Sequence, residues 1–314
     1  MLALGGLLMP VLMAAGYTEK VSLGLVTGTG SIGLLLPPCV PLIFYAVIAG
    51  VDIKDMFLAG VLPAFLLIAL AAGWGIYKAP PRTSAVTGRG FELRELGEAA
   101  WIAKWELLLP VVAIASLFSG LATPVEAAAL TATYAFVVET FIYRDLHIFK
   151  DVPRVMAEAG TLVGGVLIIL GVALGLTNYL AFAEVPAKAV DWVTTAVHSK
   201  WLFLLLVNVF LLLVGMLMDV YSAIVIVVPL LVPLGRAFGV EPIHLGIIFL
   251  ANLELGYLHP PVGQNLFLSS MRFNKPIMEV FWATLPMLIV FLVGVLLITY
   301  VPAMSTTLPR LLAR

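Results

Sequence analysis

The chain has 314 residues, a formal net charge of −1 and a single cysteine. Hydrophobic residues make up 62% of it and charged residues 11%, and the mean hydropathy is +1.12. A soluble domain needs more polar surface than this composition supplies, and the near-neutral charge gives no sign of a nucleic-acid partner. Long continuous apolar runs, rather than short alternating ones, favour an all-α polytopic membrane protein over a β-barrel.

The first 80 residues predict three membrane elements, and a polar loop follows them. Residues 1–16 resemble the end of a helical hairpin, and residues 21–49 form an apolar segment that glycines and prolines interrupt. Proline lacks a backbone N–H and clashes with the preceding turn, so 21–49 is predicted to be a broken helix. Residues 57–78 predict a plain crossing. The basic stretch 81–104 is predicted to be a cytoplasmic loop.

Residues 105–303 show the same order of broken helix and plain helix after a longer front part. Residues 105–143, which Thr123-Pro124 splits, and residues 201–234 each exceed one crossing, so both are predicted to be hairpins. The other predicted elements are a glycine-rich span at 160–183, a broken helix at 244–271, a plain helix at 280–301 and a tail at 304–314.

A shift of 223 positions superimposes the breaks of the two broken helices. Gly33 then meets Gly256, and Pro37-Pro38 meets Pro260-Pro261. The same shift pairs further residues without a gap: Pro10 with Pro233, Gly16 with Gly239, Phe44 with Phe267 and Pro63 with Pro286. These matches predict an internal duplication. The front of the second copy, roughly 105–222, has no counterpart in the first, so we expect the start of the first copy to be missing.

One motif in the first break suggests a nucleotide site. The stretch Gly28-Thr-Gly-Ser-Ile-Gly33 matches G-x-G-x-x-G, and Asp52 follows further on. The dinucleotide fingerprint requires a helix directly after the glycines, and prolines interrupt that helix at positions 37, 38 and 41. We therefore reject this interpretation.

Duplicated broken helices are typical of secondary transporters. In such proteins the breaks meet near the bilayer midplane, where helix termini and unwound carbonyls bind substrate and coupling ions. The alternative is that paired prolines simply kink two core helices, which membrane helices tolerate. The repetition of the breakers in both copies favours transport. Polar side chains beside the breaks are candidate ligands: Thr27, Thr29, Ser31, Glu254, His259, Gln264 and Asn265.

Some of these groups have an equally plausible structural role. Hydroxyls can bond to their own helix carbonyls, and Asp219 could be a cation ligand or the N-cap at the turn of a hairpin, of which we favour the cap. Thr123 and Glu126 fit a capping box. A hard cation prefers oxygen ligands, so backbone carbonyls near the breaks are candidates too: those around Gly33, Leu36, Pro38, Gly256, His259 and Pro261. No nucleophile–base pair is present, so neither an enzyme nor a cofactor is predicted.

Four stretches carry a family resemblance. They are GSIGLLLPPCVPLIFY at 30–45, FLAGVLP at 57–63, TPVEAAA at 123–129 and LELGYLHPPVGQNLF at 253–267. In these residues the chain resembles the large membrane subunit, the DctM-like permease, of tripartite ATP-independent periplasmic (TRAP) transporters. The resemblance implies an inverted-repeat, elevator-type carrier with re-entrant hairpins in the bacterial inner membrane. It also implies sodium coupling, a periplasmic substrate-binding protein and a small membrane subunit.

The resemblance further implies two sodium sites, each between a hairpin tip and the broken helix that faces it. The second site would comprise Gly215, Asp219, Gly256, His259 and Val262, and the part of the first that is present would comprise Gly33, Leu36 and Pro38. Many members carry threonine where this chain has His259, so a hydroxyl ligand is lost there.

The resulting hypothesis is a sodium-driven carrier of a small organic acid such as a C4-dicarboxylate or a sugar acid. The expected substrate contacts are Thr27, Ser31, Gln264 and Asn265. The alternative is an inactive fragment, or a structural or regulatory membrane subunit without transport of its own.

Overall fold

The computed structural model describes residues 2–80, 93–118 and 122–312, and every regular element within them is a helix. By length and composition, five helices in these residues suit a membrane crossing: Ile53–Tyr77, Val125–Ile142, Lys200–Leu217, Val220–Ala237 and Ile277–Tyr300. The predicted all-α polytopic class is therefore confirmed. The chain forms two compact units, one within 1–86 and 173–314 and the other within 87–172.

The smaller unit contains α5 (Leu93–Ile102), α6 (Lys104–Phe118), α7 (Pro124–Val137), the π-helical turn η3 (Val138–Ile142) and the first part of α8 (Asp151–Phe182). The helices α6 and α7 of the predicted hairpin at 105–143 pack against each other. A capping box starts α7, because the Glu126 N–H donates to Thr123 Oγ1 (3.3 Å) and the Thr123 N–H donates to Glu126 Oε2 (2.8 Å). The structural role predicted for Glu126 is thus confirmed. Of the predicted loop 81–104, residues 81–92 lie outside the described residues.

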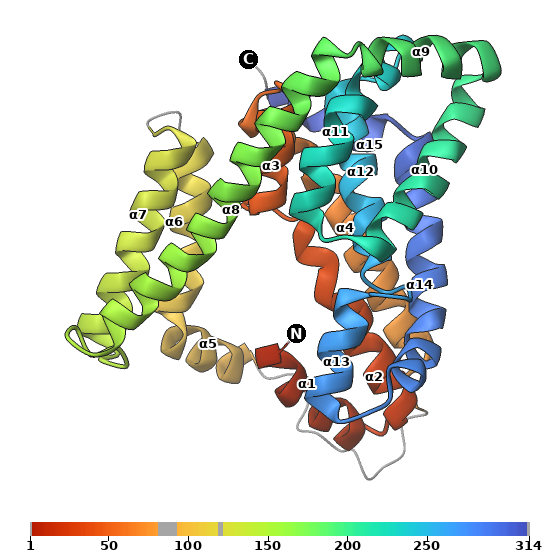
Figure 1. The fold of residues 1–314 in the computed structure, drawn as a ribbon. Helices are drawn as coiled ribbons and strands as arrows, with labels where there is room; N and C mark the ends of the chain where they lie inside the picture. The colour runs from red at the N-terminus through yellow and green to blue at the C-terminus, as the bar shows by residue number, and fades with distance from the viewer. Residues whose placement is uncertain (1, 81–92, 119–121, 313–314) are drawn as a thin grey trace. The chain divides into compact units, whose positions relative to one another are not determined.

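The larger unit contains both broken helices (Figure 1). Its elements are α1 (Leu2–Ala14), α2 (Glu19–Gly28), the 3-10 helix η1 (Thr29–Leu34), α3 (Val40–Ala49), α4 (Ile53–Tyr77), the end of α8, α9 (Val185–Ala196), α10 (Lys200–Leu217), α11 (Val220–Ala237), α12 (Pro242–Gly256), α13 (Gln264–Phe273), α14 (Ile277–Tyr300) and α15 (Ala303–Leu312). The first broken helix is α2–η1–α3, and the second is α12–α13.

The secondary structure recurs at the shift of 223 positions. Helix α2 begins at Glu19 and α12 at Pro242, and each follows a glycine in the left-handed region, Gly16 (φ +89°) or Gly239 (φ +67°). Both Pro-Pro peptide bonds of the breaks are cis. The start of the second broken helix, α12, packs against α3 and η1, and its end, α13, packs against α1 and α2. The two copies therefore run in opposite directions, as an inverted repeat requires.

Helix α12 forms the centre of the larger unit. Its residues from His244 to Gly256 are all buried, because α3, α4, α10, α11 and α14 surround it. The aromatic ring of Phe249 lies 6.0 Å from that of Tyr45, whose hydroxyl donates to the Pro242 carbonyl (2.8 Å). Helix α12, which leads into the second break, therefore lies in the protein interior rather than against lipid.

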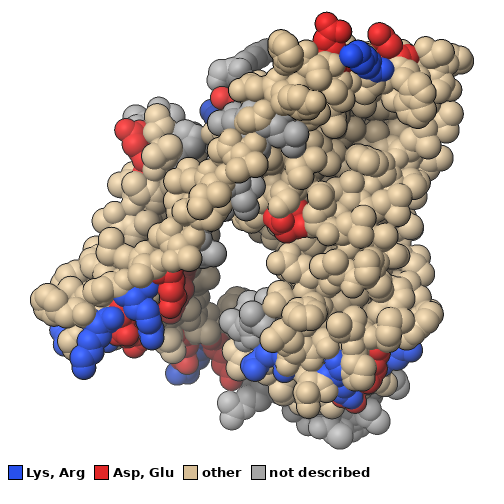
Figure 2. Space-filling view, viewed as in Figure 1, with Lys and Arg blue, Asp and Glu red and all other residues tan. Residues whose placement is uncertain are grey.

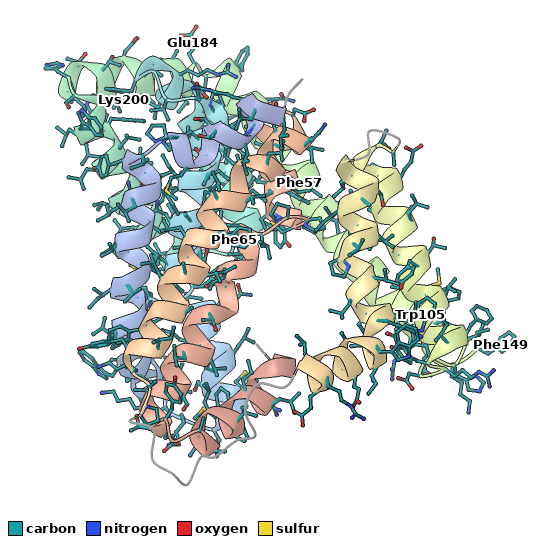
Figure 3. All side chains as sticks on the ribbon, turned by 180° about the vertical axis from the view of Figure 1, so that it is seen from behind. Phe57, Phe65, Trp105, Phe149, Glu184 and Lys200 are labelled. Atoms are coloured by element: carbon teal, nitrogen blue, oxygen red, sulfur yellow. The ribbon has the colours of Figure 1, made fainter. Side chains whose placement is uncertain are left out.

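The outer surface of this unit suits a lipid environment. Phe65 of α4 is 59% exposed, whereas Phe57 of the same helix is 1% exposed (Figure 3). Most charged side chains gather near the ends of the helices, and the broad band between them is uncharged apart from an acidic patch near its middle (Figure 2). Backbone groups inside helices are satisfied internally, so such a band can face hydrocarbon at little cost.

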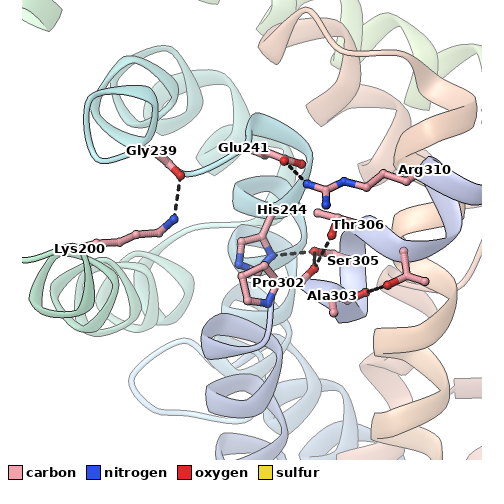
Figure 4. Close-up of polar contacts among 10 residues, drawn as sticks. Lys200, Gly239, Glu241, His244, Pro302, Ala303, Ser305, Thr306 and Arg310 are labelled. Carbon is pink, nitrogen blue, oxygen red and sulfur yellow. Dashed lines mark hydrogen bonds and ion pairs between the residues drawn. The ribbon is translucent and has the colours of Figure 1, made fainter.

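Polar contacts join α15 to the start of α12 (Figure 4). Arg310 forms an ion pair with Glu241, and His244 Nδ1 lies 2.7 Å from Ser305 Oγ. The Lys200 ammonium donates to the Gly239 carbonyl (2.7 Å). Residues 304–314, predicted only as a tail, thus supply most of a helix that also packs against α4.

Candidate functional site

The end of α10 contacts the second break. A Cβ atom added at Gly256 would lie 2.5 Å from the carbonyl carbon of Gly215, so the two glycine backbones meet directly. The Val262 N–H donates to the Met216 carbonyl (3.3 Å). Since only glycine permits such an approach, the sequence brings Gly215, Gly256 and Val262 together through backbone atoms. These are three of the five residues predicted for the second sodium site.

Asp219, the fourth predicted residue, is the N-cap of α11. Its Oδ2 accepts from the Tyr221 N–H (2.9 Å) and the Ser222 N–H (3.2 Å), and its Oδ1 accepts from the Ser222 hydroxyl (2.5 Å). The capping role that we favoured is confirmed. The adjacent Val220 N–H donates to the hydroxyl of Tyr257, one residue beyond Gly256 (3.3 Å). The turn of the hairpin is therefore fixed to the break on both sides of Asp219.

His259, the fifth predicted residue, is exposed and turns toward its own backbone. Its Nδ1 lies 2.6 Å from the Pro260 carbonyl oxygen, which can only accept, so Nδ1 carries the hydrogen. Its backbone N–H donates to the Gly256 carbonyl (3.2 Å). Within the described residues, the polar contacts of His259 with the break are therefore this ring contact with Pro260 and the backbone hydrogen bond to Gly256.

The first break differs from the second at its glycine. Gly33, Leu36 and Pro38 are exposed, and a Cβ at Gly33 would meet no described atom within 4 Å. At the equivalent Gly256, the same atom would contact the α10–α11 turn. The two breaks thus share a backbone design but differ in what covers them.

The predicted substrate residues lie on both broken helices, and two of them meet. The Asn265 side-chain amide donates to the Thr27 carbonyl (3.3 Å), and the Thr27 hydroxyl lies 2.7 Å from Ser269 Oγ. Ser31 donates to the carbonyl of Gly28, at a long 3.5 Å, within its own helical segment. Thr27, Ser31 and Asn265 are buried, whereas Gln264 is exposed as the first residue of α13.

Two buried polar groups beside the second break have unusual surroundings. Glu254 is 1% exposed, and neither of its carboxyl oxygens has a hydrogen-bond partner among the described residues. Two residues earlier on α12, the Asn252 amide donates to Asn208 Oδ1 (2.8 Å), which also accepts from the Thr299 hydroxyl (3.1 Å). Buried polar groups are costly without partners, so this polar lining constrains how α10, α12 and α14 pack beneath the break.

Backbone groups meet at the second break. Within the described residues, no group of three or more His, Cys, Asp or Glu side chains converges on a point that could hold a metal. What meets there instead is backbone, because the last turns of α10 and α12 approach each other at Gly215 and Gly256. Oxygen-only environments are those that hard cations such as sodium prefer.

Sequence reasoning missed Ser269, Tyr257 and Asn208. Each had a usable signal in its spacing. Ser269 follows Asn265 by four residues and so shares its face of α13. Asn208 precedes Gly215 by seven residues, or two turns, on α10, and Tyr257 directly follows the glycine of the break.

Comparison with known proteins agrees with this architecture. Residues 1–304 match the family described as the tripartite ATP-independent periplasmic transporter, DctM component. The chain is 35% identical to the C4-dicarboxylate TRAP transporter large permease protein DctM of Pseudomonas aeruginosa, over 98% of this chain and 72% of that protein. It is 33% identical to the Rhodobacter capsulatus protein of the same name, over 99% and 73%.

A further relative has the combined name DctMQ. The isethionate TRAP transporter permease protein DctMQ of Oleidesulfovibrio alaskensis is 34% identical over 96% of this chain and 47% of that protein. The matched family comprises permease subunits of transporters rather than enzymes, and its members reside in the inner membrane. The inverted broken helices, the apolar surface and these matches together show that the chain belongs to the DctM family of TRAP transporter large permease subunits.

Proposed function

We propose that this chain is the permease subunit of a sodium-coupled carrier of a small organic acid, supplied by a periplasmic binding protein and assisted by a small membrane subunit. The names of its relatives support the substrate class, because they specify C4-dicarboxylates, isethionate and 2,3-diketo-L-gulonate. All of these are small organic anions. The DctMQ name supports a second membrane component.

One observation carries the proposal, namely the backbone contact between Gly215 and Gly256. Gly215 lies in the last turn of α10 and Gly256 in the last turn of α12, so the contact brings the carbonyl ends of two separate helices together. Gly215, Gly256 and Val262 would hold the cation, and the cation supplies positive charge that stabilises this contact. Asp219 adds a negative charge close by while it caps α11.

The start of α13 suits the anion. Gln264 is exposed at the first position of this helix, and among the described residues no side chain caps the helix start, although the Asn265 N–H donates to the Tyr257 carbonyl (3.1 Å). The N-terminus of a helix carries a partial positive charge that favours carboxylates. The Asn265 amide ties this terminus to the carbonyl of Thr27 on the other broken helix. Cation binding at the break would therefore order the same seven-residue connection, 257–263, that positions the anion site.

Uptake by proteoliposomes tests the proposal. Vesicles would contain this chain and the small subunit, and the cognate binding protein would supply labelled acids named for the relatives. We expect uptake of at least one acid under an inward sodium gradient and none under an equal potassium gradient. Equal uptake under both gradients would refute sodium coupling, and no uptake of any acid by a folded assembly would refute the carrier function.

The substrate contacts have a separate test. Asn265→Ala removes the amide that joins α13 to Thr27, so we expect a marked loss of uptake at a fixed sodium gradient. Thr195→Ala is the control, because its hydroxyl is exposed and donates to the Asp191 carbonyl of its own helix (2.7 Å). Unchanged uptake by the Asn265 variant would show that this residue does not shape the anion site.

A further inference from the structure

A pocket on the larger unit lies outside both breaks. It has a volume of about 240 Å³ and lies between α2, α4 and α14. Its lining residues are Lys20, Val21, Gly24, Leu25, Trp74, Lys78, Ala283, Pro286 and Met287. Its floor is therefore apolar, and its two charged residues are both lysines.

The two lysines lie at the same end of the unit. Lys20 is in the first turn of α2, and Lys78 directly follows α4. The Tyr17 hydroxyl donates to the Gly75 carbonyl (3.0 Å), which ties the start of α2 to the end of α4. Trp74 and Tyr77 lie beside Lys78, with its ammonium 4.9 and 5.0 Å from their ring centroids. Aromatic and basic residues at the end of an apolar span mark the level of the lipid headgroups.

The positive charge at this mouth is not neutralised within the described residues. Neither Lys20 nor Lys78 forms an ion pair there, and the adjacent Glu19 binds Lys275 instead (2.9 Å). Two unpaired ammonium groups at the mouth of one pocket attract an anion. Because the positive-inside rule assigns the basic loop after Lys78 to the cytoplasm, the mouth would face the leaflet that carries anionic lipid.

The repeat does not explain these lysines. At the shift of 223 positions, Lys20 corresponds to Ile243, Lys78 to Val301 and Trp74 to Leu297. The matching groove of the second copy therefore has no cation at these positions. The basic mouth belongs to one copy only, although α2 and α12 share one backbone design.

We propose that the groove between α2, α4 and α14 binds an anionic phospholipid, with its phosphate between Lys20 and Lys78 and an acyl chain along Leu25 and Met287. A small soluble anion would leave the apolar floor unfilled, and a zwitterionic lipid would bring its own cation to the lysines. An anionic amphiphile satisfies both ends of the pocket. This inference is independent of the proposed transport activity.

Brominated lipids provide the test, because bromine quenches nearby tryptophan fluorescence. The whole chain would be reconstituted in nanodiscs of phosphatidylcholine with small amounts of brominated phosphatidylglycerol or brominated phosphatidylcholine. We expect stronger quenching by the brominated phosphatidylglycerol, and Trp74→Phe should remove most of the difference. The combined variant Lys20→Gln/Lys78→Gln should weaken the apparent affinity about 25-fold, at roughly fivefold for each lysine. Lys54→Gln/Lys188→Gln is the control, since both lysines are exposed and lie away from the pocket.

Several results would overturn the proposal. Equal quenching by the two lipids, or retention of the preference by the Lys20 and Lys78 variant, would show that the lysines do not recognise a headgroup. Loss of the preference on addition of glycerol phosphate would identify a soluble anion as the occupant. If the double variant fails to fold by circular dichroism, the comparison of the two lipids on the unaltered chain and on Trp74→Phe still decides the matter.

Discussion

Replacement of Gly256 by alanine tests the central contact of the second break. The added Cβ would lie 2.5, 2.6 and 2.7 Å from the carbonyl carbon, Cα and oxygen of Gly215. All three are backbone atoms, so no side-chain rotation relieves the overlap. The α10–α11 turn must move away from the break, or the end of α12 must shift.

The expected cost follows from overpacking in a close-packed interior, about 1–3 kcal/mol. If that cost acts on the contact between Gly215 and Gly256, the arrangement in which the two residues touch becomes roughly 5–150-fold less favoured. We expect a lower unfolding temperature for the Gly256→Ala protein in detergent. We also expect a higher sodium concentration at half-maximal uptake, since the displaced carbonyls belong to the predicted cation site.

Two further glycine variants make the comparison quantitative. A Cβ at Gly215 would lie 3.1 Å from Leu253 and 3.2 Å from Gly256, so Gly215→Ala should cost less. A Cβ at Gly73 of α4 would meet no described atom within 4 Å, so Gly73→Ala should be neutral or gain about 0.5–1 kcal/mol from helix propensity. The reasoning fails if Gly256→Ala melts at or above the temperature of the unaltered protein with unchanged sodium dependence.

Three other predictions concern single polar groups. Asp219→Ala removes the N-cap of α11 and should cost about 1 kcal/mol in thermal unfolding, whereas Asp219→Asn should preserve stability. If the stable Asp219→Asn protein nevertheless bound sodium more weakly, Asp219 would be a cation ligand as well as a cap. Asn208→Leu removes the acceptor of the Asn252 amide and should destabilise the protein by about 1–3 kcal/mol. Chemical unfolding would measure this loss, and an unchanged free energy of unfolding would show that the hydrogen bond between Asn208 and Asn252 does not stabilise the fold. Hydrogen bonds from Lys275 to Glu19 and Glu279 raise the pKa of Lys275 in the folded protein. The stability that they contribute is therefore fully present below the ordinary lysine pKa of about 10.4, and it is lost as the pH rises through the raised pKa. Lys275→Gln should abolish this alkaline decline in melting temperature, and an unchanged decline would point to another group.

Local features of the fold were predictable because their causes are local. Prolines and glycines interrupt helices wherever they occur, so the breaks and their shift of 223 positions were visible in the sequence. The cap of α11 by Asp219 and the capping box of Thr123 and Glu126 depend on groups within three residues. The rejection of a nucleotide site at Gly28–Gly33 also needed only the prolines that follow.

The sequence by itself determined the class of the protein, its duplication and the places where its helices break, since apolar length and missing backbone donors act over one or two turns. Only the tertiary structure decided which segment covers which break. The Gly215–Gly256 contact and the Asn265–Thr27 hydrogen bond join residues from separate helices, and separate helices also enclose Glu254. Such proximity depends on how whole helices pack, and no pattern along the chain encodes it directly.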